Sequence, residues 1–280
     1  MKIVLAGTPE FSVEVFEEII NHFNVVAIIS QPDKPANRGY KLIPTPVKLL
    51  AQKYNIKLFQ PEKISNIYEE LKEIDFDIFL TCAFGQYIPE KILNLPKIAS
   101  INIHGSLLPK YRGAAPIQYS LLNNDKKTGI NLIYMTKDMD AGDILASAQL
   151  EIDEYDTSDR LFVKMSKLAT NHITKWLNNF EHLQKNAIKQ DPTLVTLSPK
   201  LKKEEALIDH TKSVLENFGK IRAYSSNPGA YMFVDGKRVK IYYASKKHVK
   251  NAIIVPCCDG QLYAIDYQFE SKKRVVIKPY

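Results

Sequence analysis

Short apolar runs alternate with amphipathic stretches through the first half of this 280-residue chain, and this alternation constrains the fold more than any other feature. Four runs have the length and composition of buried strands, and in three stretches apolar residues recur at the spacing of a helix. The predicted strands are residues 3–6, 25–30, 78–82 and 100–103, and the predicted helices are residues 10–21, 47–54 and 67–74. Such alternation predicts an α/β fold, a mostly parallel sheet with helices on both faces. Ligands of these sheets bind at the carboxyl ends of the strands.

The middle of the chain predicts a β-hairpin followed by a long helix. Two strand-like runs flank a short polar turn, and a helical pattern follows them. The runs are residues 129–135 and 143–152, the turn is 137–142, and the helix is 159–180.

The C-terminal third has a different pattern, of short strands joined by tight turns. A helix is predicted at 209–222, and two Asp-Gly pairs, at 235–236 and 259–260, stand between alternating runs and are strong hairpin signals. We infer a small β-barrel or meander of the OB type, preceded by a polar linker that contains two prolines. The predicted strands are residues 230–234, 239–244, 252–255, 262–267 and 274–278. We expect the chain to divide into a first domain at 1–185, the linker at 186–205 and the C-terminal domain at 206–280.

The basic excess of the chain is confined to its C-terminal third. Residues 200–280 hold 16 of the 38 Lys and Arg but 8 of the 31 Asp and Glu, a net charge of +8, whereas residues 1–199 have a net charge of −1. This asymmetry indicates that a polyanion binds there, although a solvated lysine-rich surface gives the same count. The three cysteines form no C-x-x-C pair, and no apolar run is long enough for a signal or membrane segment, so we expect a cytoplasmic protein.

The segment from Asn102 to Pro116 carries the residues expected to do chemistry. Asn102 and His104 stand two apart at the end of a predicted strand, so their side chains project from one face. A lone histidine there is usually structural, but two polar side chains on a buried strand are costly without partners. The glycine- and proline-rich loop that follows lets a ligand approach the backbone closely. An amide and an imidazole side by side therefore predict a site.

Three carboxylates, Asp138, Asp140 and Asp143, stand in and beside the hairpin turn. One of them can orient His104 and set its protonation. The spacing also resembles a calcium loop, but Gly142 occupies the fifth position and no Glu stands at the twelfth, so we expect no metal. Capping of the turn remains open for the other two carboxylates. The chain has no P-loop and no G-x-S-x-G motif, which leaves nucleotide-driven chemistry without support.

Together these residues resemble the signature of the folate-dependent formyltransferases. The matching segments are residues 102–109, 112–116 and 140–143, in the same order along the chain. The resemblance implies a Rossmann-like sheet, 10-formyltetrahydrofolate as formyl donor, and Asn102, His104 and Asp140 as the catalytic trio. It also implies a folate site, whose residues are Ser106, Leu107, Leu108, Pro109, Gly85 and Asp138.

Two further features resemble the branch of this family that formylates initiator methionyl-tRNA. Residues 31–48 resemble its long basic loop, which reaches into the acceptor end of the tRNA, and residues 197–205 and 221–224 resemble the entry to its C-terminal domain. The resemblance implies that the tRNA contacts Arg38, Lys34, Lys41 and Arg112. We expect a monomer that binds folate and tRNA and no membrane.

The expected reaction is attack by an α-amine, with an unperturbed pKa of about 8, on the formyl carbon. The amide of Asn102 would stabilise the oxyanion, while His104 and Asp140 would move the proton. Three alternatives stay open: a formyltransferase acting on an amino-sugar nucleotide, a hydrolase that releases formate from the folate, and a nucleic-acid-binding module on an inactive scaffold. The basic loop and the C-terminal domain argue against the first two, and the intact trio argues against the third.

Overall fold

The computed structural model of the chain describes residues 1–35 and 42–278, and the chain divides into two compact units. The first unit comprises Met1–Arg112, Gly129–Gln149 and Val163–Leu197. The second comprises Gly113–Thr128, Leu150–Phe162 and Ser198–Tyr280. Each unit is therefore assembled from separate stretches of chain, and the domain boundaries expected from the sequence stay a prediction.

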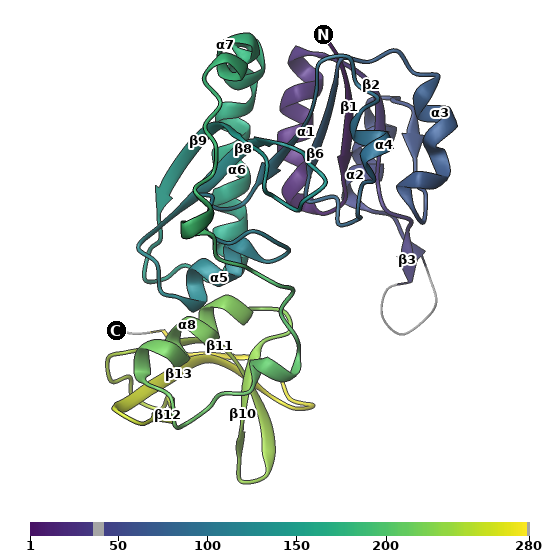
Figure 1. Ribbon diagram of the computed structural model, residues 1–280. Coiled ribbons are helices and arrows are strands. Elements are labelled where there is room, and N and C mark those ends of the chain that lie inside the picture. The colour runs from purple at the N-terminus through teal and green to yellow at the C-terminus, as the bar shows by residue number, and fades with distance from the viewer. Residues whose placement is uncertain (36–41, 279–280) are drawn as a thin grey trace. The chain divides into compact units, whose positions relative to one another are not determined.

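A seven-stranded sheet, in the order β5-β2-β1-β6-β7-β8-β9, forms the centre of the first unit (Figure 1). The first five strands in this order, from β5 through β2, β1 and β6 to β7, pair in parallel, and β8 runs antiparallel to β7. The four predicted strands and the mostly parallel, Rossmann-like sheet are confirmed, and the predicted hairpin supplies β8 and β9. The bounds are β1 Lys2–Gly7, β2 Asn24–Ile29, β5 Leu58–Phe59, β6 Ile78–Cys82, β7 Ala99–His104, β8 Lys127–Tyr134 and β9 Ile144–Glu151.

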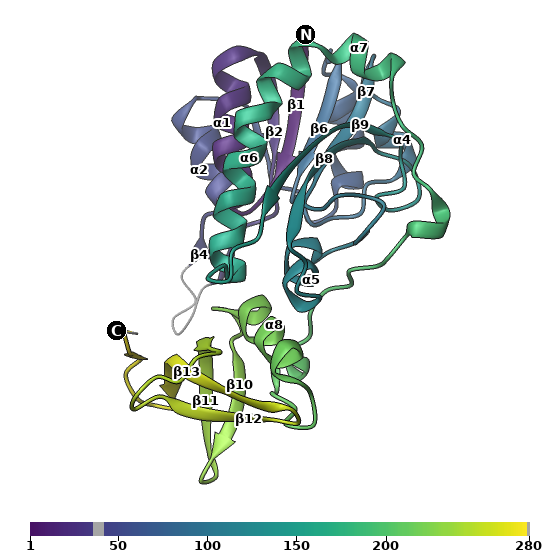
Figure 2. The ribbon, with the colours of Figure 1, turned by 90° about the vertical axis from the view of Figure 1, so that its left-hand side faces the viewer.

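Helices cover both faces of this sheet. On one face α1 (Glu10–His22) and α6 (Ser158–Asn178) lie side by side (Figure 2). Two hydrogen bonds join these helices: Ser166 Oγ donates to the carbonyl of Phe11 at 3.0 Å, and Thr174 Oγ1 donates to Glu18 Oε1 at 2.6 Å. On the other face lie the short helices α3 and α4. The remaining bounds are α2 Pro46–Lys53, η1 Ile64–Ile67, α3 Tyr68–Lys72, α4 Glu90–Leu93, α5 Pro116–Leu122 and α7 Phe180–Lys185.

The single helix predicted at 159–180 is interrupted in the structure. It ends at Asn178, and the separate helix α7 begins at Phe180. Between them Asn179 takes a non-helical conformation, with φ −105° and ψ 21°. Asparagine favours such breaks because its side chain competes with the helical backbone for hydrogen bonds.

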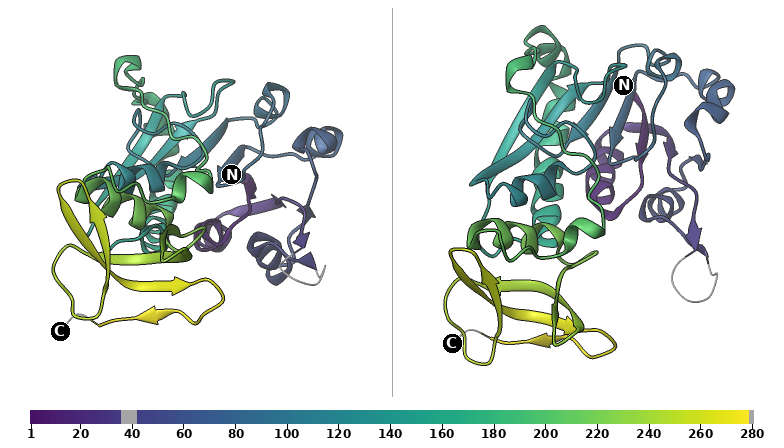
Figure 3. Two further views of the ribbon diagram at one scale, coloured as in Figure 1. Left: turned by 90° about the horizontal axis from the view of Figure 1, so that it is seen from below. Right: turned by 60° about the horizontal axis from the view of Figure 1, so that its bottom comes forward.

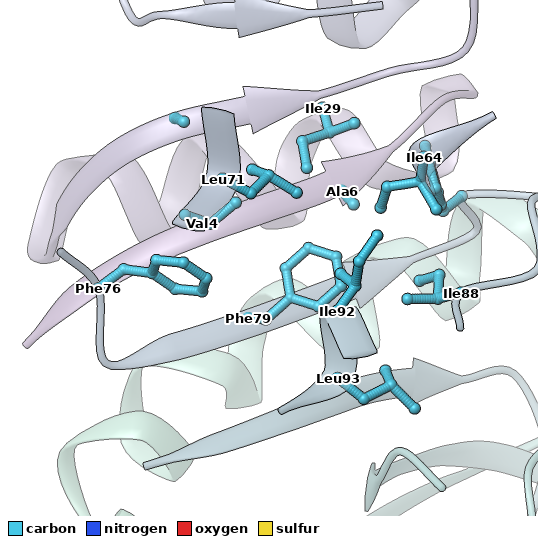
Figure 4. Packing of buried hydrophobic residues seen from close by; sticks show 12 residues of the cluster. Val4, Ala6, Ile29, Ile64, Leu71, Phe76, Phe79, Ile88, Ile92 and Leu93 are labelled. Carbon is cyan, nitrogen blue, oxygen red and sulfur yellow. The ribbon is translucent and has the colours of Figure 1, made fainter. Parts of the chain in front are cut away.

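The core beneath α3 and α4 shows why apolar runs form these strands. Alternate residues of a strand face opposite sides, so Val4 and Ala6 of β1 and Ile29 of β2 face this side together. They pack with further buried side chains from the surrounding elements, namely Ile64, Leu71, Phe76, Phe79, Ile88, Ile92 and Leu93 (Figure 4). The intervening Ile3 and Leu5 are also fully buried, on the opposite face. Each fully buried side chain of this kind stabilises the fold by about 1.5–3 kcal/mol.

The second unit contains an antiparallel sheet of five strands in the order β10-β11-β13-β12, with β14 also paired to β13. Helix α8 (Val214–Tyr224) contacts β10, β11 and β13, and Figure 3 shows this helix in green beside the yellow-green and yellow strands. The predicted C-terminal β domain is confirmed. Since no pairing joins β10 to β12 among the described residues, it is an open form of the predicted barrel. The bounds are β10 Ala230–Val234, β11 Lys237–Ser245, β12 Ile253–Cys257, β13 Gly260–Phe269 and β14 Val275–Val276.

Two details of this unit differ from the sequence prediction. Helix α8 begins at Val214 rather than at residue 209, because Ser213 caps it in a capping box with Glu216. The second hairpin turn lies one residue earlier than predicted, since Cys257 pairs directly with Gly260.

Candidate active site

The carboxyl ends of β1, β2 and β6 are joined by hydrogen bonds at one edge of the sheet. Thr8 Oγ1 and Gln31 Nε2 both donate to the carbonyl of Phe84, at 3.0 and 2.9 Å. The chain runs outward from β1 to β2 and returns to β6 on the other side, so this edge is a topological switch point, where α/β sheets bind ligands. Gly85, one of the expected folate-site residues, lies here with φ +78°, and a Cβ on it would stand 2.6 Å from Gln31 Nε2.

Asn102, His104 and Asp140 converge at the same edge. Asn102 and His104 end strand β7, and Asp140 lies in the loop between β8 and β9. His104 Nδ1 is 3.5 Å from Asp140 Oδ2, and Asn102 Nδ2 donates to Asp140 Oδ1 at 3.4 Å. The side chains of His104 and Asp140 are 5% and 13% exposed, so water screens their interaction little. Of the three carboxylates considered from the sequence, Asp140 is the one the fold brings to the histidine.

The hydrogen bonds of His104 fix which ring nitrogen carries a proton. Nε2 lies 2.9 Å from the carbonyl oxygen of Tyr111. A carbonyl can only accept, so Nε2 must donate. Nδ1, which faces Asp140, is therefore the ring nitrogen that can gain or lose a proton.

The amide of Asn102 is oriented by Thr81 on the neighbouring strand β6. Thr81 Oγ1 donates to Asn102 Oδ1 at 2.8 Å. This bond assigns the carbonyl end of the amide to Thr81 and turns the NH₂ group toward Asp140. An N–H donor therefore lies next to the histidine and the carboxylate, at the end of the strand.

The loop after β7 holds four of the expected folate-site residues in a fixed conformation. Ser106 Oγ donates to the carbonyl of Lys110 at 2.6 Å and closes the loop. The amide of Leu108 donates to Asn131 Oδ1 at 2.6 Å, and the Leu108–Pro109 peptide bond is cis. Leu107 also packs against Gly129 of strand β8. A Cβ placed on Gly129 would lie 2.6 Å from Leu107 Cδ2. Sequence analysis missed Asn131, whose signal is a polar residue inside an apolar strand.

The loop that carries Asp140 has an unusual backbone. Asp140 has φ +52°, and a Cβ on Gly142 would lie 2.0 Å from the carbonyl oxygen of Tyr134. Asp138, expected at the folate site, is exposed, and its carbonyl accepts from Thr136 Oγ1 at 2.9 Å. Gln190 donates to the carbonyls of Asp140 and Gly142, both at 2.8 Å. Nothing in the sequence marks Gln190, since the two carbonyls it donates to and the Arg112 side chain that donates to it all lie far away along the chain.

Of the residues expected to contact tRNA, Lys34 and Arg112 lie in the described part of the chain. Lys34 begins the short strand β3 (Lys34–Pro35), which pairs with β4 (Leu42–Ile43), and its Nζ donates to Gln31 Oε1 at 3.1 Å. Arg112 donates from Nε to Gln190 Oε1 at 2.9 Å. Arg38 and Lys41 lie outside the described residues.

An ion pair joins the two ends of the β3–β4 segment. Lys48 Nζ lies 2.5 Å from Asp33 Oδ2, and Gln60 Nε2 donates to Asp33 Oδ1 at 2.7 Å. The hydrogen bond from Lys48 is the main cause that lowers the pKa of Asp33, and the bond from Gln60 adds to it. The base of the basic loop is thereby fixed to the body of the first unit.

No group of three or more His, Cys, Asp or Glu side chains is arranged to hold a metal ion within residues 1–35 and 42–278. Over the same described ranges, no helix is both long and apolar enough to cross a membrane.

Comparison with known proteins identifies the class of this chain as formyl transferase. The family described as "Formyl transferase" matches residues 1–177, and "Formyl transferase, C-terminal domain" matches residues 200–280. A methionyl-tRNA formyltransferase of Mycoplasmopsis pulmonis is 59% identical over 98% of this chain and 96% of its own length. One from Staphylococcus aureus is 37% identical over 100% of this chain and 95% of its own length. The chain therefore belongs to the methionyl-tRNA formyltransferase family.

Solved structures share the fold at lower sequence identity. A methionyl-tRNA formyltransferase from Clostridium thermocellum has a TM-score of 0.65 and 21% identity, covering 96% of this chain and 99% of that one. The sugar 3N-formyl transferase WlaRD, solved in the presence of dTDP and 5-N-formyl-THF, has a TM-score of 0.69 and 22% identity, covering 98% and 99%. At these identities the likeness concerns the architecture alone.

Proposed function

We propose that the chain transfers the formyl group of 10-formyltetrahydrofolate to the α-amine of initiator methionyl-tRNA. The observation that carries the proposal is the convergence of Asn102, His104 and Asp140 at the switch point of the sheet, in a chain of this family. An amide donor and an imidazole nitrogen, each within 3.5 Å of one carboxylate, form the set of groups that acyl transfer to an amine requires.

The three side chains divide the reaction between them. As the amine attacks the formyl carbon, negative charge develops on the formyl oxygen, and the NH₂ group of Asn102 donates to it. One such donor stabilises the transition state by about 3 kcal/mol. The attacking nitrogen loses a proton to His104 Nδ1, and Asp140 stabilises the imidazolium that results. The bond between the formyl carbon and N10 of the folate then breaks, and N10 leaves with the proton that Nδ1 returns.

In the proposed reaction the folate binds beside the trio, at the carboxyl ends of the strands. The residues that would hold it are Ser106, Leu107, Leu108, Pro109, Gly85 and Asp138, on the loops that end β6, β7 and β8. The fixed conformation of the loop after β7, set by Asn131 and Ser106, supports this assignment because a rigid loop orders a ligand at low entropic cost.

The acceptor is held by cationic side chains, which we assign to Lys34, Arg38, Lys41 and Arg112. The net charge of +8 in residues 200–280 supports a second contact of the C-terminal domain with the phosphate backbone. We also propose that the protein acts as a cytoplasmic monomer. The alternative acceptor, an amino-sugar nucleotide, is favoured only by fold similarity to sugar formyltransferases at 22% and 20% identity.

A panel of acceptors tests the function. Formyl transfer from 10-formyltetrahydrofolate is measured with initiator methionyl-tRNA, an elongator aminoacyl-tRNA, free methionine and a dTDP-linked amino sugar. Transfer confined to initiator methionyl-tRNA, with a KM that rises steeply with salt, is the expected result. Transfer to the amino sugar alone would overturn the assignment of the acceptor.

A further inference from the structure

The side chain of Gln190 uses all of its hydrogen-bonding groups in one network. Nε2 donates to the carbonyls of Asp140 and Gly142, both at 2.8 Å, and Oε1 accepts from Arg112 Nε at 2.9 Å. Because two partners only accept and one only donates, the network also fixes which end of the amide is nitrogen. Gln190 thus holds the loop on either side of Ala141.

The loop that Gln190 holds requires such support. Asp140 has φ +52°, a backbone conformation that costs a residue other than glycine about 1 kcal/mol or more. Gly142 packs so closely on the carbonyl of Tyr134 that no side chain fits. A strained loop of this kind persists only where its surroundings determine its conformation. The carboxylate of Asp140 can face His104 only while the backbone stays in place.

The segment around Gln190 is itself anchored to the first unit. Ile188 pairs with Ile144 through backbone hydrogen bonds of 2.8 and 2.9 Å, at the start of β9. Asp191 then caps the 3-10 turn η2 (Pro192–Leu194) by accepting from the amide of Thr193 at 2.8 Å. Gln190 therefore projects from a fixed backbone, between a strand pairing and a capped turn.

The same segment also supports the partner of His104. Thr196 Oγ1 accepts from the amide of Tyr111 at 2.9 Å, and the carbonyl of Thr196 accepts from the amide of Arg112 at 2.9 Å. The Tyr111 carbonyl is the acceptor for His104 Nε2. Residues 188–196, which we call the brace, thus contact the backbone on both sides of the His104–Asp140 pair.

We infer that Gln190 is a positioning residue for the formyl transfer, and that the brace sets the distance between His104 Nδ1 and the Asp140 carboxylate. The inference rests on the proposed function, since it concerns the same trio. Gln190 contacts neither the formyl donor nor the acceptor in this account; it acts through Asp140. A shift of about 1 Å in a catalytic group lowers a rate by roughly 100-fold.

The first test is a double-mutant cycle with formyl transfer to methionyl-tRNA. Gln190→Ala is expected to lower kcat by roughly 100-fold while the KM for either substrate changes by less than about threefold. In an Asp140→Ala background the same substitution is expected to cost less than about threefold, because the group it positions is gone. Gln190→Glu, which cannot donate to the two carbonyls, is expected to be as slow as Gln190→Ala. Gln184→Ala on α7 is the matched control and keeps the wild-type kcat.

The second test does not depend on the acceptor. Amide hydrogen exchange of residues 136–143 is expected to be faster in Gln190→Ala than in wild type and in Gln184→Ala. Unchanged exchange in this loop, or a loss of kcat that persists undiminished in the Asp140→Ala background, would overturn the positioning role. A wild-type protein that formylates no tRNA would refute the proposed function instead, and loop exchange would still decide the role of Gln190.

Discussion

His104 donates from Nε2 to the main-chain carbonyl of Tyr111 at 2.9 Å, and this bond leaves Nδ1 facing Asp140. The backbone acceptor cannot donate, so the neutral imidazole must be the Nε2–H tautomer. In the proposed mechanism, Asp140 stabilises the cation that forms when Nδ1 takes a proton. One hydrogen bond to the backbone thus selects the nitrogen that can act as a base.

The tautomer can be measured directly. In protein labelled with ¹⁵N-histidine, the ring signals of His104, assigned by their loss in His104→Ala, are expected to show a protonated Nε2 and an unprotonated Nδ1 at high pH. The proton gained on acidification is expected at Nδ1. A neutral ring that carries its proton on Nδ1 would contradict the hydrogen bond to Tyr111 and the proposed base.

The conformation of the Asp140 loop requires a residue without a side chain at position 142. A Cβ on this residue would lie 2.0 Å from the carbonyl oxygen of Tyr134, which is backbone and cannot rotate away. Gly142→Ala must therefore displace the loop, and we expect kcat to fall by about 100-fold. Steady-state formyl transfer with saturating substrates measures the effect, with thermal unfolding to verify that the variant is folded. A folded variant with the wild-type kcat would show that the loop position does not matter.

The central sheet could be predicted from the sequence because its strands are apolar runs bounded by polar turns. Residues 78–82 coincide with β6 from end to end, and each of the other three predicted strands lies within one residue of its observed limits. The break at Asn179 could not be seen, since apolar periodicity continues across it. Periodicity records burial, whereas a single residue can leave the helical conformation without disturbing the pattern.

The candidate site was predictable only in part. Asn102 and His104 share a face of one strand, which the two-residue period makes visible in the sequence. Only the family resemblance indicates Asp140, because three carboxylates stand in and beside the turn and only the folded loop shows which one faces the histidine. Gln190 lies in a polar segment without periodicity. Its partners are two carbonyls 50 and 48 residues away and the Arg112 side chain 78 residues away, so no local signal exists.

Arg222 is one basic residue of the C-terminal third that serves the fold. Its side chain is buried, at 4% exposure. Nη1 donates to the carbonyl of Asp153 at 3.2 Å, and Nη2 donates to Asn124 Oδ1 at 3.0 Å. The guanidinium also lies 4.6 Å from the ring centroid of Phe218. Burial lowers its pKa. Arg222→Met removes both hydrogen bonds of a buried guanidinium, so we expect the free energy of unfolding in urea to fall by about 1–3 kcal/mol.

The exposed Lys237 provides the control for that substitution. Lys237→Met is expected to change the free energy of unfolding by less than about 0.5 kcal/mol. Equal stability of Arg222→Met and wild type would contradict a structural role for Arg222.

The Asp33–Lys48 ion pair predicts a specific dependence of stability on pH. The hydrogen bond from Lys48 lowers the pKa of Asp33 below its ordinary value of 3.8, so the charged carboxylate is favoured in the folded state. Its stabilisation is complete above pH 3.8 and is lost as the pH falls through the lower pKa of the folded state. Asp33→Asn is therefore expected to be less stable than wild type at pH 7, by a difference that shrinks at low pH. Urea midpoints at both pH values test this, and a difference independent of pH would contradict it.

The most direct test of the central claim is a single-turnover measurement of formyl transfer to initiator methionyl-tRNA, with enzyme and 10-formyltetrahydrofolate in excess. Wild type is compared with Asn102→Ala, His104→Ala and Asp140→Ala, and tRNA binding is measured in parallel. We predict transfer by wild type, a loss of roughly 100-fold or more in each variant, and unchanged tRNA affinity. A variant that transfers the formyl group at close to the wild-type rate would contradict the assignment of its residue, and a wild type without transfer would contradict the proposed function.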